Sequence, residues 1–470
     1  MAIHALGLEN FKRFSKFSIE LSRPVTVILG ENSSGKSSIL KSLLALKQTA
    51  STNNEHESWA AQGDYVDLGV YQDYVHKKDV RKKFKIKLSL GSEFVRKLTL
   101  ARRVVDGATG LEIEFNYDHD PITSQARILA IRGSYSHGQG LYSWELCRQK
   151  TRKNYALSLS RDLTESFNRF FPMPGSEKPL KEGESVVVAH DEKLTFRSTS
   201  AGRRLAHQFS IRIVNDTISS LSAYLDRNLF YLAPLRAAPY RSYVRSSHSL
   251  TVGVKGEYTP SVLANLERRT QKVTRGESLH KTNLELLQRW IDAVFPGYQI
   301  RAKAFDELVK LYVANGDTES YLSNERADTL TDVGFGFSQV VPILVQLAVM
   351  PPGSTLIIEQ PELHLHPKAQ TRLATVVGEA AAAGRRVIVE THSEHFVRGL
   401  QLAVSSGRGK KTPRLSADMV NFFYLKQRAS QVERLSMSKY GEFEQDWPSG
   451  FFDESYRAIK VLLANKLRGE

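Results

Sequence analysis

Four residues near the start of the chain have the types and the spacing that bind phosphate. Gly30, Gly35, Lys36 and Ser37 fill the pattern G-x-x-x-x-G-K-S/T, with an apolar run before it and a helix-compatible run after it. Glycines let backbone N–H groups turn toward phosphate oxygens, the lysine neutralises the β- and γ-phosphates, and the serine hydroxyl can bind Mg²⁺. We therefore predict a P-loop that binds ATP and Mg²⁺. Its expected nucleotide contacts are Asn32, Ser33, Ser34, Gly35, Lys36, Ser37 and Ser38.

Two later apolar runs end in polar residues that suit the same chemistry. The run "STLIIE" ends in Glu359, and a carboxylate at the end of a strand beside a P-loop holds Mg²⁺ directly or through water, as in a Walker-B motif. The run "RRVIVE" precedes Thr391, His392 and Ser393, so a polar residue at its tip can reach the γ-phosphate. We predict Glu359 and Ser37 as metal ligands and His392 as a catalytic residue.

A third stretch predicts an anion-binding helix. In "TDVGFGFSQVVPILVQLAVM", Gly334, Gly336 and Ser338 stand at the start of a long apolar helix. The N-terminus of a helix presents free N–H groups and a positive dipole end, and both favour an anion. We therefore expect Ser338 to contact a phosphate.

The elements that must position these residues follow from periodicity. Residues 3–21 alternate apolar and polar side chains and predict a β-hairpin leading into the P-loop strand, residues 25–29. Short alternating runs from about 83 to 196 predict an antiparallel β lobe. Helical spacing appears at 205–228 and 279–294. A last α/β block begins near Thr329, and one of its helices begins at Pro367.

Composition narrows the class of protein. The chain has 470 residues and a net charge of +15, and its basic residues cluster at 76–87, 148–153 and 236–245, which suits a polyanion such as double-stranded DNA. The alternative is a solvated basic surface. Cys147 is the single cysteine, which fits a reducing compartment. No signal peptide and no uncharged apolar run long enough to span a membrane is present, so we expect a cytoplasmic protein that does not bind membranes.

These motifs carry a family resemblance. The chain resembles the RecF/SMC/OLD-type branch of the ABC ATPases, in which "LIIEQPELHLHP" corresponds to Walker B and D-loop, "ETHSEH" to the His switch and "GFGFSQ" to the signature motif. The resemblance is strong over about 1–75 and 325–400, where the motif order also matches. Within the branch the chain is similar to stand-alone ATPases of prokaryotic anti-phage systems, such as the ATPase subunits of Septu and PARIS. The stretches "YLAPLRAAPYRSY" and "WPSGFFDE" add to this likeness, although we assign no mechanism to either stretch.

The resemblance implies a fold class: α/β, with an ABC-type P-loop ATPase core, an inserted antiparallel β lobe and a helical segment. The expected domains are 1–75, the N-terminal part of the core with the P-loop; 76–200, the β-rich lobe; 201–325, a helical or mixed insertion; and 326–470, the C-terminal part of the core with signature, Walker B, His switch and a terminal helix.

One position departs from the family pattern. Most ABC ATPases carry a catalytic Glu after the Walker-B acid, whereas this chain has Gln360, whose amide can orient water but cannot accept its proton. Three explanations remain open. Hydrolysis is slow, or Glu362 or His392 contributes to catalysis, or residue 360 was altered to trap ATP. Another alignment makes Glu359 the base and leaves the metal to Ser37 and a Q-loop residue, for which Gln62 and Gln72 are candidates.

Three other features have less specific interpretations. His364 and His366 in "HLHP" suggest a metal pair, but without a third ligand nearby we favour a structural role in the D-loop. The acids between 442 and 455 evoke a nuclease centre, yet too few residues follow His392 for a TOPRIM domain, so we expect no intrinsic nuclease. The segment 451–466 has helical spacing that indicates packing against the body or, less often, a partner.

We therefore expect an ATP-binding, slowly hydrolysing ATPase that acts as a nucleotide-dependent oligomeric switch or scaffold in anti-phage defence. The resemblance implies a homo-oligomer, at least a head-to-tail dimer in which Ser338 of one chain meets the phosphate held by Lys36 of the other. It also implies a separately encoded effector nuclease and sensing of DNA or a phage factor. The alternatives are a RecF-like DNA-repair ATPase and, less favoured, the nucleotide-binding subunit of a membrane transporter.

Overall fold

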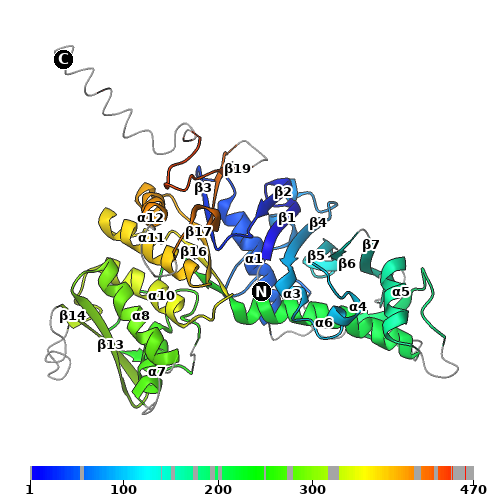
Figure 1. The fold of residues 1–470 in the computed structure, drawn as a ribbon, viewed down its shortest axis with the longest axis horizontal. Coiled ribbons are helices and arrows are strands. Elements are labelled where there is room, and N and C mark those ends of the chain that lie inside the picture. The colour runs from blue at the N-terminus through cyan, green and yellow to red at the C-terminus, as the bar shows by residue number, and fades with distance from the viewer. Residues whose placement is uncertain are drawn as a thin grey trace. The chain divides into compact units, whose positions relative to one another are not determined.

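A P-loop requires a parallel sheet that brings strand ends together, and the computed structural model contains one (Figure 1). The structure describes residues 3–52, 58–138, 140–149, 154–172, 178–190, 196–198, 204–247, 250–271, 279–315, 328–406, 414–427, 432–445, 447 and 461. The predicted terminal helix, 451–466, lies outside the described residues apart from Val461, as do residues 150–153 of the second basic cluster.

The chain divides into two compact units that interleave in sequence. The first comprises Met1–Ser22 and Ser37–Leu229, and the second comprises Arg23–Lys36 and Phe230–Glu470. The four consecutive domain ranges predicted from the sequence stay a prediction. Strand-to-strand pairing between distant segments defines the units, and such pairing leaves no mark on local composition.

The first unit is built on a nine-stranded sheet in the order β10-β9-β8-β7-β6-β5-β4-β1-β2, in which the described neighbours pair antiparallel. Alternating side chains bury one face, as in β4, where Phe84, Ile86 and Leu88 are fully buried. The predicted β lobe is therefore confirmed, and the opening hairpin extends the same sheet. The strands are β1 (Ile3–Phe11), β2 (Phe14–Glu20), β4 (Phe84–Gly91), β5 (Gly110–His119), β6 (Ala126–His137), β7 (Gly140–Arg148), β8 (Asn154–Leu159), β9 (Val186–His190) and β10 (Phe196–Ser198).

The opposite face of this sheet carries a ladder of alternating charges. Lys85 lies 3.4 Å from Glu9 and 3.8 Å from Glu114, and Arg132 lies 4.0 Å from Glu114 and 2.7 Å from Glu145. A further pair, Lys87 and Glu112, is separated by 2.7 Å. We call these seven residues the charged ladder. Lys85 and Lys87 belong to the first basic cluster, so part of that cluster is neutralised by acids on neighbouring strands.

Helices complete the first unit. The side chain of Lys47 on α1 donates to the carbonyls of Leu225 (3.1 Å) and Asp226 (2.8 Å), the last turn of the long helix α6, whose bounds match the predicted helix. A lysine at this position satisfies carbonyls that have no intrahelical donor. The helices are α1 (Lys36–Ser51), α2 (Tyr71–Tyr74), η1 (His76–Lys78), α3 (Ser92–Val95), α4 (Ala101–Val104), α5 (Arg161–Phe170) and α6 (Leu205–Asn228).

The second unit contains a six-stranded sheet in the order β11-β16-β17-β3-β18-β19. Strands β16, β17, β3 and β18 are parallel neighbours, so their carboxyl ends meet at one edge, and β19 adds an antiparallel edge. Every residue of β3, β16 and β18 is buried, which explains why these strands read as continuous apolar runs. The strands are β3 (Val25–Gly30), β11 (Leu229–Leu232), β16 (Thr355–Glu359), β17 (Arg386–Glu390), β18 (Val420–Leu425) and β19 (Val432–Leu435).

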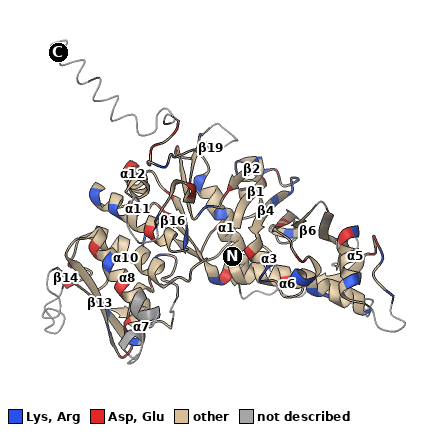
Figure 2. Ribbon diagram, viewed as in Figure 1, with Lys and Arg blue, Asp and Glu red and all other residues tan. Residues whose placement is uncertain are grey.

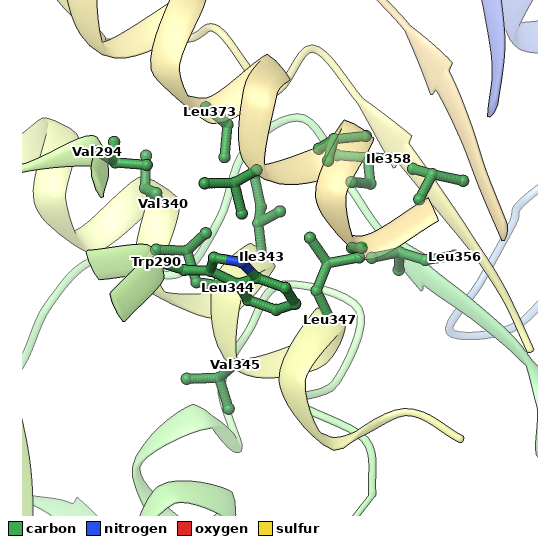
Figure 3. Close-up of a cluster of buried hydrophobic side chains, with 14 of the residues drawn as sticks. Trp290, Val294, Val340, Ile343, Leu344, Val345, Leu347, Leu356, Ile358 and Leu373 are labelled. Carbon is green, nitrogen blue, oxygen red and sulfur yellow. The ribbon is translucent and has the colours of Figure 1, made fainter. Parts of the chain in front are cut away.

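Helices pack on this sheet around one hydrophobic core. Trp290 of α8 lies among Ile343, Leu344 and Leu347 of α10, with Leu356 and Ile358 of β16 close by (Figure 3). The apolar sequence of α10 follows from this position, because 13 of its 15 residues are buried. The predicted helix at Pro367 and the predicted helix 279–294 are both present. These helices are α7 (Thr259–Gln271), α8 (Leu279–Val294), α10 (Phe335–Val349), α11 (Pro367–Ala382), α12 (Glu394–Ser405) and η2 (Ala417–Met419).

A smaller sheet lies in the segment that was predicted as helical or mixed. Strand β14 pairs with β12, β13 and β15 in antiparallel fashion. Ile300, Val309, Leu311 and Val313 point into the core of the second unit. The strands are β12 (Tyr243–Val244), β13 (Tyr298–Phe305), β14 (Leu308–Asn315) and β15 (Asp328–Thr329).

Candidate functional site

The P-loop connects the end of β3 to the start of α1. Gly30 and Gly35 have φ values of 143° and 100°, which residues with side chains rarely adopt, and Ser33 has a φ of 61°. Helix α1 begins at Lys36, so its first free N–H groups face the same loop. The backbone therefore has the curvature and the donors that a phosphate requires.

The side chain of Lys36 is held inside this loop. Its ammonium donates to the carbonyls of Gly30 (2.9 Å) and Glu31 (2.8 Å) and lies 3.7 Å from the carboxylate of Glu390. The side chain is buried, and this burial lowers the pKa of Lys36, while Glu390 opposes that change. The cation is thus placed where the sequence predicted it.

The other predicted nucleotide contacts lie around this lysine in the chain. Asn32 and Ser33 are exposed, Ser34 is buried, and Ser37 and Ser38 are half-buried in the first turn of α1. The backbone N–H of Ser34 donates to the carbonyl of Glu31 at 3.3 Å. Their contacts with a nucleotide stay a prediction.

Glu359 ends β16 and is buried, as the Walker-B prediction requires. Its carboxylate accepts a hydrogen bond of 2.7 Å from the hydroxyl of Tyr231 on β11. The next residue, Gln360, has a left-handed φ of 44°, and its N–H donates to the carbonyl of Glu390 at 2.7 Å. The chain therefore turns sharply after Glu359. The side chains of Glu359 and Gln360 are thus not related as successive residues of a strand, which alternate between the two faces of a sheet.

A second buried carboxylate, Glu390, ends the neighbouring strand β17 in register with Glu359. Burial is the largest cause that raises the pKa of Glu390 to about 7; the nearby Lys36 opposes this rise, and Glu359 and Glu362 add to it. Sequence reasoning missed this residue. The available signal was a single charged residue closing an apolar strand, the same signal that identified Glu359.

His392 lies just beyond this carboxylate. Its Nε2 is 3.7 Å from Glu390, and burial together with the nearby Lys36 lowers the pKa of the imidazole. The carboxylate of Glu362 accepts hydrogen bonds from the Thr391 hydroxyl and the His392 N–H, both at 2.8 Å. Glu362 therefore holds the turn that carries His392, and both of its oxygens have partners.

The signature stretch forms the first turn of α10. Ser338 is buried, and its hydroxyl donates to the carbonyl of Phe335 at 2.6 Å. The ring of Phe335 meets the ring of His364 edge to face at 4.9 Å. A pocket of about 390 Å³ opens beside these residues, lined by apolar side chains including Phe295 and Phe337. The signature turn is thus packed against the segment that follows Walker B.

The histidines of "HLHP" have local partners. The ring of His366 accepts a hydrogen bond from the N–H of Lys368 at 3.3 Å, which caps helix α11, and His364 packs on Phe335 as described above. Gln62 and Gln72, the two candidate Q-loop residues, are exposed in the first unit.

The third basic cluster is not a continuous surface, and one prediction made from it was wrong. Arg236 was expected to face DNA, but it is buried, and its guanidinium donates to the carbonyls of Glu359 (2.9 Å) and Gln360 (3.2 Å). Arg241 and Arg245 are exposed, and Arg241 pairs with Asp332 at 3.2 Å. Basic and acidic residues alternate over much of the chain (Figure 2).

Two family models match this chain. The model described as "AAA ATPase domain" matches residues 1–192, and the model described as "AAA domain, putative AbiEii toxin, Type IV TA system" matches residues 280–398. Between them they include the P-loop, the signature stretch, Glu359 and Glu390. Each model covers less than half of the chain, so the match is a similarity to ATPase domains.

Individual relatives match over shorter stretches. The DNA replication and repair protein RecF of Staphylococcus epidermidis is 30% identical over 78 residues, which are 16% of this chain and 21% of that protein. RecF of Staphylococcus aureus matches to the same extent. The chain thus matches about a fifth of the length of these relatives.

Solved structures of SMC head domains align over most of the chain. The SMC head bound to the C-winged helix domain of ScpA has a TM-score of 0.42 at 13% identity, covering 93% of this chain and 98% of that one. The SMC head domain from Thermotoga maritima has a TM-score of 0.37 at 11% identity, covering 93% and 100%. No helix in the described part of the chain is both long and apolar enough to cross a membrane.

Proposed function

We propose that this protein binds ATP with Mg²⁺ and hydrolyses it slowly, and that the bound nucleotide joins two copies of the chain. The observation that carries the proposal is the meeting of Lys36, Glu390 and His392 at the carboxyl edge of one parallel sheet, with Glu359 in register with Glu390. A loop of backbone N–H groups next to a buried lysine suits a triphosphate.

The donor set also suits the metal. Ser37 offers a hydroxyl oxygen and Glu359 a carboxylate oxygen, and Mg²⁺ prefers oxygen ligands supplied by one or two protein groups together with phosphates. When bound, Mg²⁺ would neutralise charge that develops on the phosphate oxygens. Lys36 would bind the β- and γ-phosphates, and the N–H groups of the P-loop would orient them.

Slow hydrolysis follows from the residues that would activate water next to the γ-phosphate of bound ATP. Gln360 can orient water but cannot accept its proton. Glu362, one proposed substitute, already accepts two hydrogen bonds that hold the His392 turn. His392 keeps one third of its side-chain surface exposed, and its lowered pKa keeps the imidazole neutral near pH 7, so it can accept a proton or a hydrogen bond from water.

The switch requires a second copy. Ser338 lies in the first turn of α10, and the family resemblance implies that this position meets the nucleotide of the partner. Each site would then combine Lys36 of one chain with Ser338 of the other. A mixture of Lys36→Ala and Ser338→Arg proteins tests this idea, since only a mixed dimer has one intact site.

The experiment uses calorimetry for ATP binding and light scattering for mass. Lys36→Ala should abolish ATP binding, and the exposed-lysine control Lys426→Ala should not. Each single variant should stay monomeric with ATP, and the mixture should regain dimers and part of the ATPase rate. If Lys36→Ala binds ATP as well as the wild type, the nucleotide site is wrong. If the mixture regains nothing, the two-chain site is wrong.

For the biological role we propose control of a separately encoded effector nuclease in anti-phage defence, with DNA or a phage factor as the trigger. The match to a family model whose description names the AbiEii toxin supports this role. The 30% identity to RecF over 78 residues supports a second candidate, a DNA-repair ATPase. Co-purification with the product of the neighbouring gene separates them: a toxic nuclease partner favours defence, and replication-fork proteins favour repair.

A further inference from the structure

The stretch "LFYLAPLRAAPYRSYVR", residues 229–245, is the most distinctive segment to which the nucleotide chemistry gives no role. We call it the bridge segment. It begins as the edge strand β11, next to β16, and then runs past the turn that follows Glu359. All contacts described below lie within the second unit.

At one end, the bridge segment contacts the Walker-B turn from three directions. The Tyr231 hydroxyl donates to the carboxylate of Glu359, and the two terminal nitrogens of Arg236 donate to the carbonyls of Glu359 and Gln360. These bonds hold both the carboxylate and the left-handed backbone turn behind it. Glu359 cannot rotate without breaking the bond from Tyr231.

The same stretch of the bridge segment also contacts a loop that is attached to α10. Ala233 and Ala237 donate through their N–H groups to the carbonyls of Val254 (2.9 Å) and Lys255 (2.8 Å). The adjoining loop is bound to α10 by Gln346, whose side chain accepts from the Val252 N–H at 3.0 Å and donates to the Leu250 carbonyl at 2.9 Å.

Two more contacts strengthen this second attachment. Gly256 lies so close to Pro342 of α10 that a Cβ there would be 2.6 Å from the proline ring. Arg241 pairs with Asp332, two residues before Gly334, which caps α10. The bridge segment is therefore connected to the start of the signature helix through Asp332 and to its middle through loop 250–256.

The burial of Arg236 shows that the arrangement is costly. Burying a guanidinium is unfavourable unless its donors are satisfied, and the Nε of Arg236 has no hydrogen-bond partner among the described residues. An apolar side chain of similar volume would serve packing at least as well. The presence of a cation at position 236 is better explained by its hydrogen bonds to two carbonyls of the Walker-B turn.

We propose that the bridge segment couples the signature helix α10 to the Walker-B carboxylate, with Tyr231 and Arg236 as positioning residues for Glu359 and Arg241 as the attachment at the far end. The inference rests on the proposed ATP-binding function. Movement of α10 when a second chain docks would pass through loop 250–256 and Arg241 to the Glu359 turn. The metal site would then be set only in the assembled state.

The test measures the Mg²⁺ concentration needed for tight ATP binding, by calorimetry, together with the ATPase rate and the thermal midpoint. Tyr231→Phe removes one hydroxyl and keeps the ring. A hydrogen bond to a charged group predicts a rise of about tenfold in the Mg²⁺ requirement, with an unchanged thermal midpoint. Arg236→Lys should restore part of what Arg236→Ala loses, because an ammonium can still donate to one carbonyl.

The far end supplies the decisive variant. Arg241 is exposed and its ion pair contributes little to stability, so Arg241→Ala should leave the thermal midpoint unchanged. Coupling predicts that it nevertheless raises the Mg²⁺ requirement about threefold and weakens ATP-dependent dimerisation. Arg245→Ala is the matched control, an exposed arginine of the same segment without a contact to Asp332 among the described residues.

The outcomes separate the two levels of argument. If the wild type does not bind ATP, the proposed function fails. If the wild type binds ATP and Tyr231→Phe has a wild-type Mg²⁺ requirement, the positioning role is wrong. If Tyr231→Phe is impaired and Arg241→Ala behaves like Arg245→Ala, coupling to α10 is overturned.

Discussion

Glu390 should make the stability of this protein depend on pH in the direction opposite to that of an ordinary paired carboxylate. Its pKa rises from 4.5 to about 7 in the folded chain, chiefly because the carboxylate is buried. Between about pH 4.5 and 7 the unfolded chain releases this proton while the folded chain keeps it. The contribution of Glu390 to folding stability therefore falls as the pH rises through this window, and the full cost is present above pH 7.

The magnitude follows from the size of the change. Each pKa unit corresponds to about 1.4 kcal/mol, so the rise to about 7 corresponds to about 3 kcal/mol of lost stability at pH 8. Glu390→Gln keeps the shape of the side chain and removes the charge. We expect it to stabilise the protein by about 3 kcal/mol at pH 8 and to have little effect near pH 4.5.

Urea denaturation of both proteins at half-unit steps from pH 4.5 to 8 measures this difference. Glu444→Gln, at an exposed position of the same unit, is the matched control and should run parallel to the wild type. Curves for Glu390→Gln and wild type that stay parallel across the whole range would refute the reasoning, because the carboxylate would then titrate alike in the folded and unfolded chains.

Three further predictions concern hydrolysis, the core and DNA. Wild-type turnover should lie below about 1 s⁻¹, and Gln360→Glu should raise it by about 100-fold or more, since a positioned base contributes at least that much. A flat or lower steady-state rate would place Gln360 away from the base position. Leu344→Ala should cost about 2–5 kcal/mol of unfolding free energy by urea denaturation, whereas Leu402→Ala at an exposed position should change it by less than about 0.5 kcal/mol. Duplex DNA binding, measured by fluorescence anisotropy, should weaken steeply as the salt concentration rises and in the double variant Lys77→Glu plus Lys78→Glu. The double variant Lys85→Gln plus Lys87→Gln should change the affinity little, because these lysines already pair with acids. Salt-insensitive binding would contradict a DNA-facing surface.

Local signals were sufficient for much of the fold. The P-loop, the helix at Pro367 and the bounds of α6 depend on glycines, a proline and apolar spacing within one short window. Lys36 was found because it belongs to the glycine-rich pattern that follows a buried strand, and Glu359 was found because it is the charged residue that ends one. Their roles toward a nucleotide remain predictions that binding experiments must test.

The remaining features depend on contacts between distant residues. Tyr231 bonds Glu359, which lies 128 residues later in the sequence. Arg236 was interpreted as a surface residue because nothing in a local cluster of arginines indicates which of them is buried. Strands β13 and β14 lie between two helical stretches, so the helical pattern on either side dominated the prediction. The joining of β1 to β4 likewise depends on pairing that no single window contains.

The charged ladder also selects one alignment of the nine-stranded sheet over its near neighbours. A slip of one residue between strands would turn apolar side chains to water, but a slip of two residues keeps the same side chains buried, so hydrophobicity alone does not forbid it. In the observed register Arg132 stands opposite both Glu114 and Glu145. A two-residue slip of β6 would separate Arg132 from both acids at once. The ladder thus distinguishes pairings that the buried face accepts equally well, and strands with a repetitive apolar pattern gain a unique register from it.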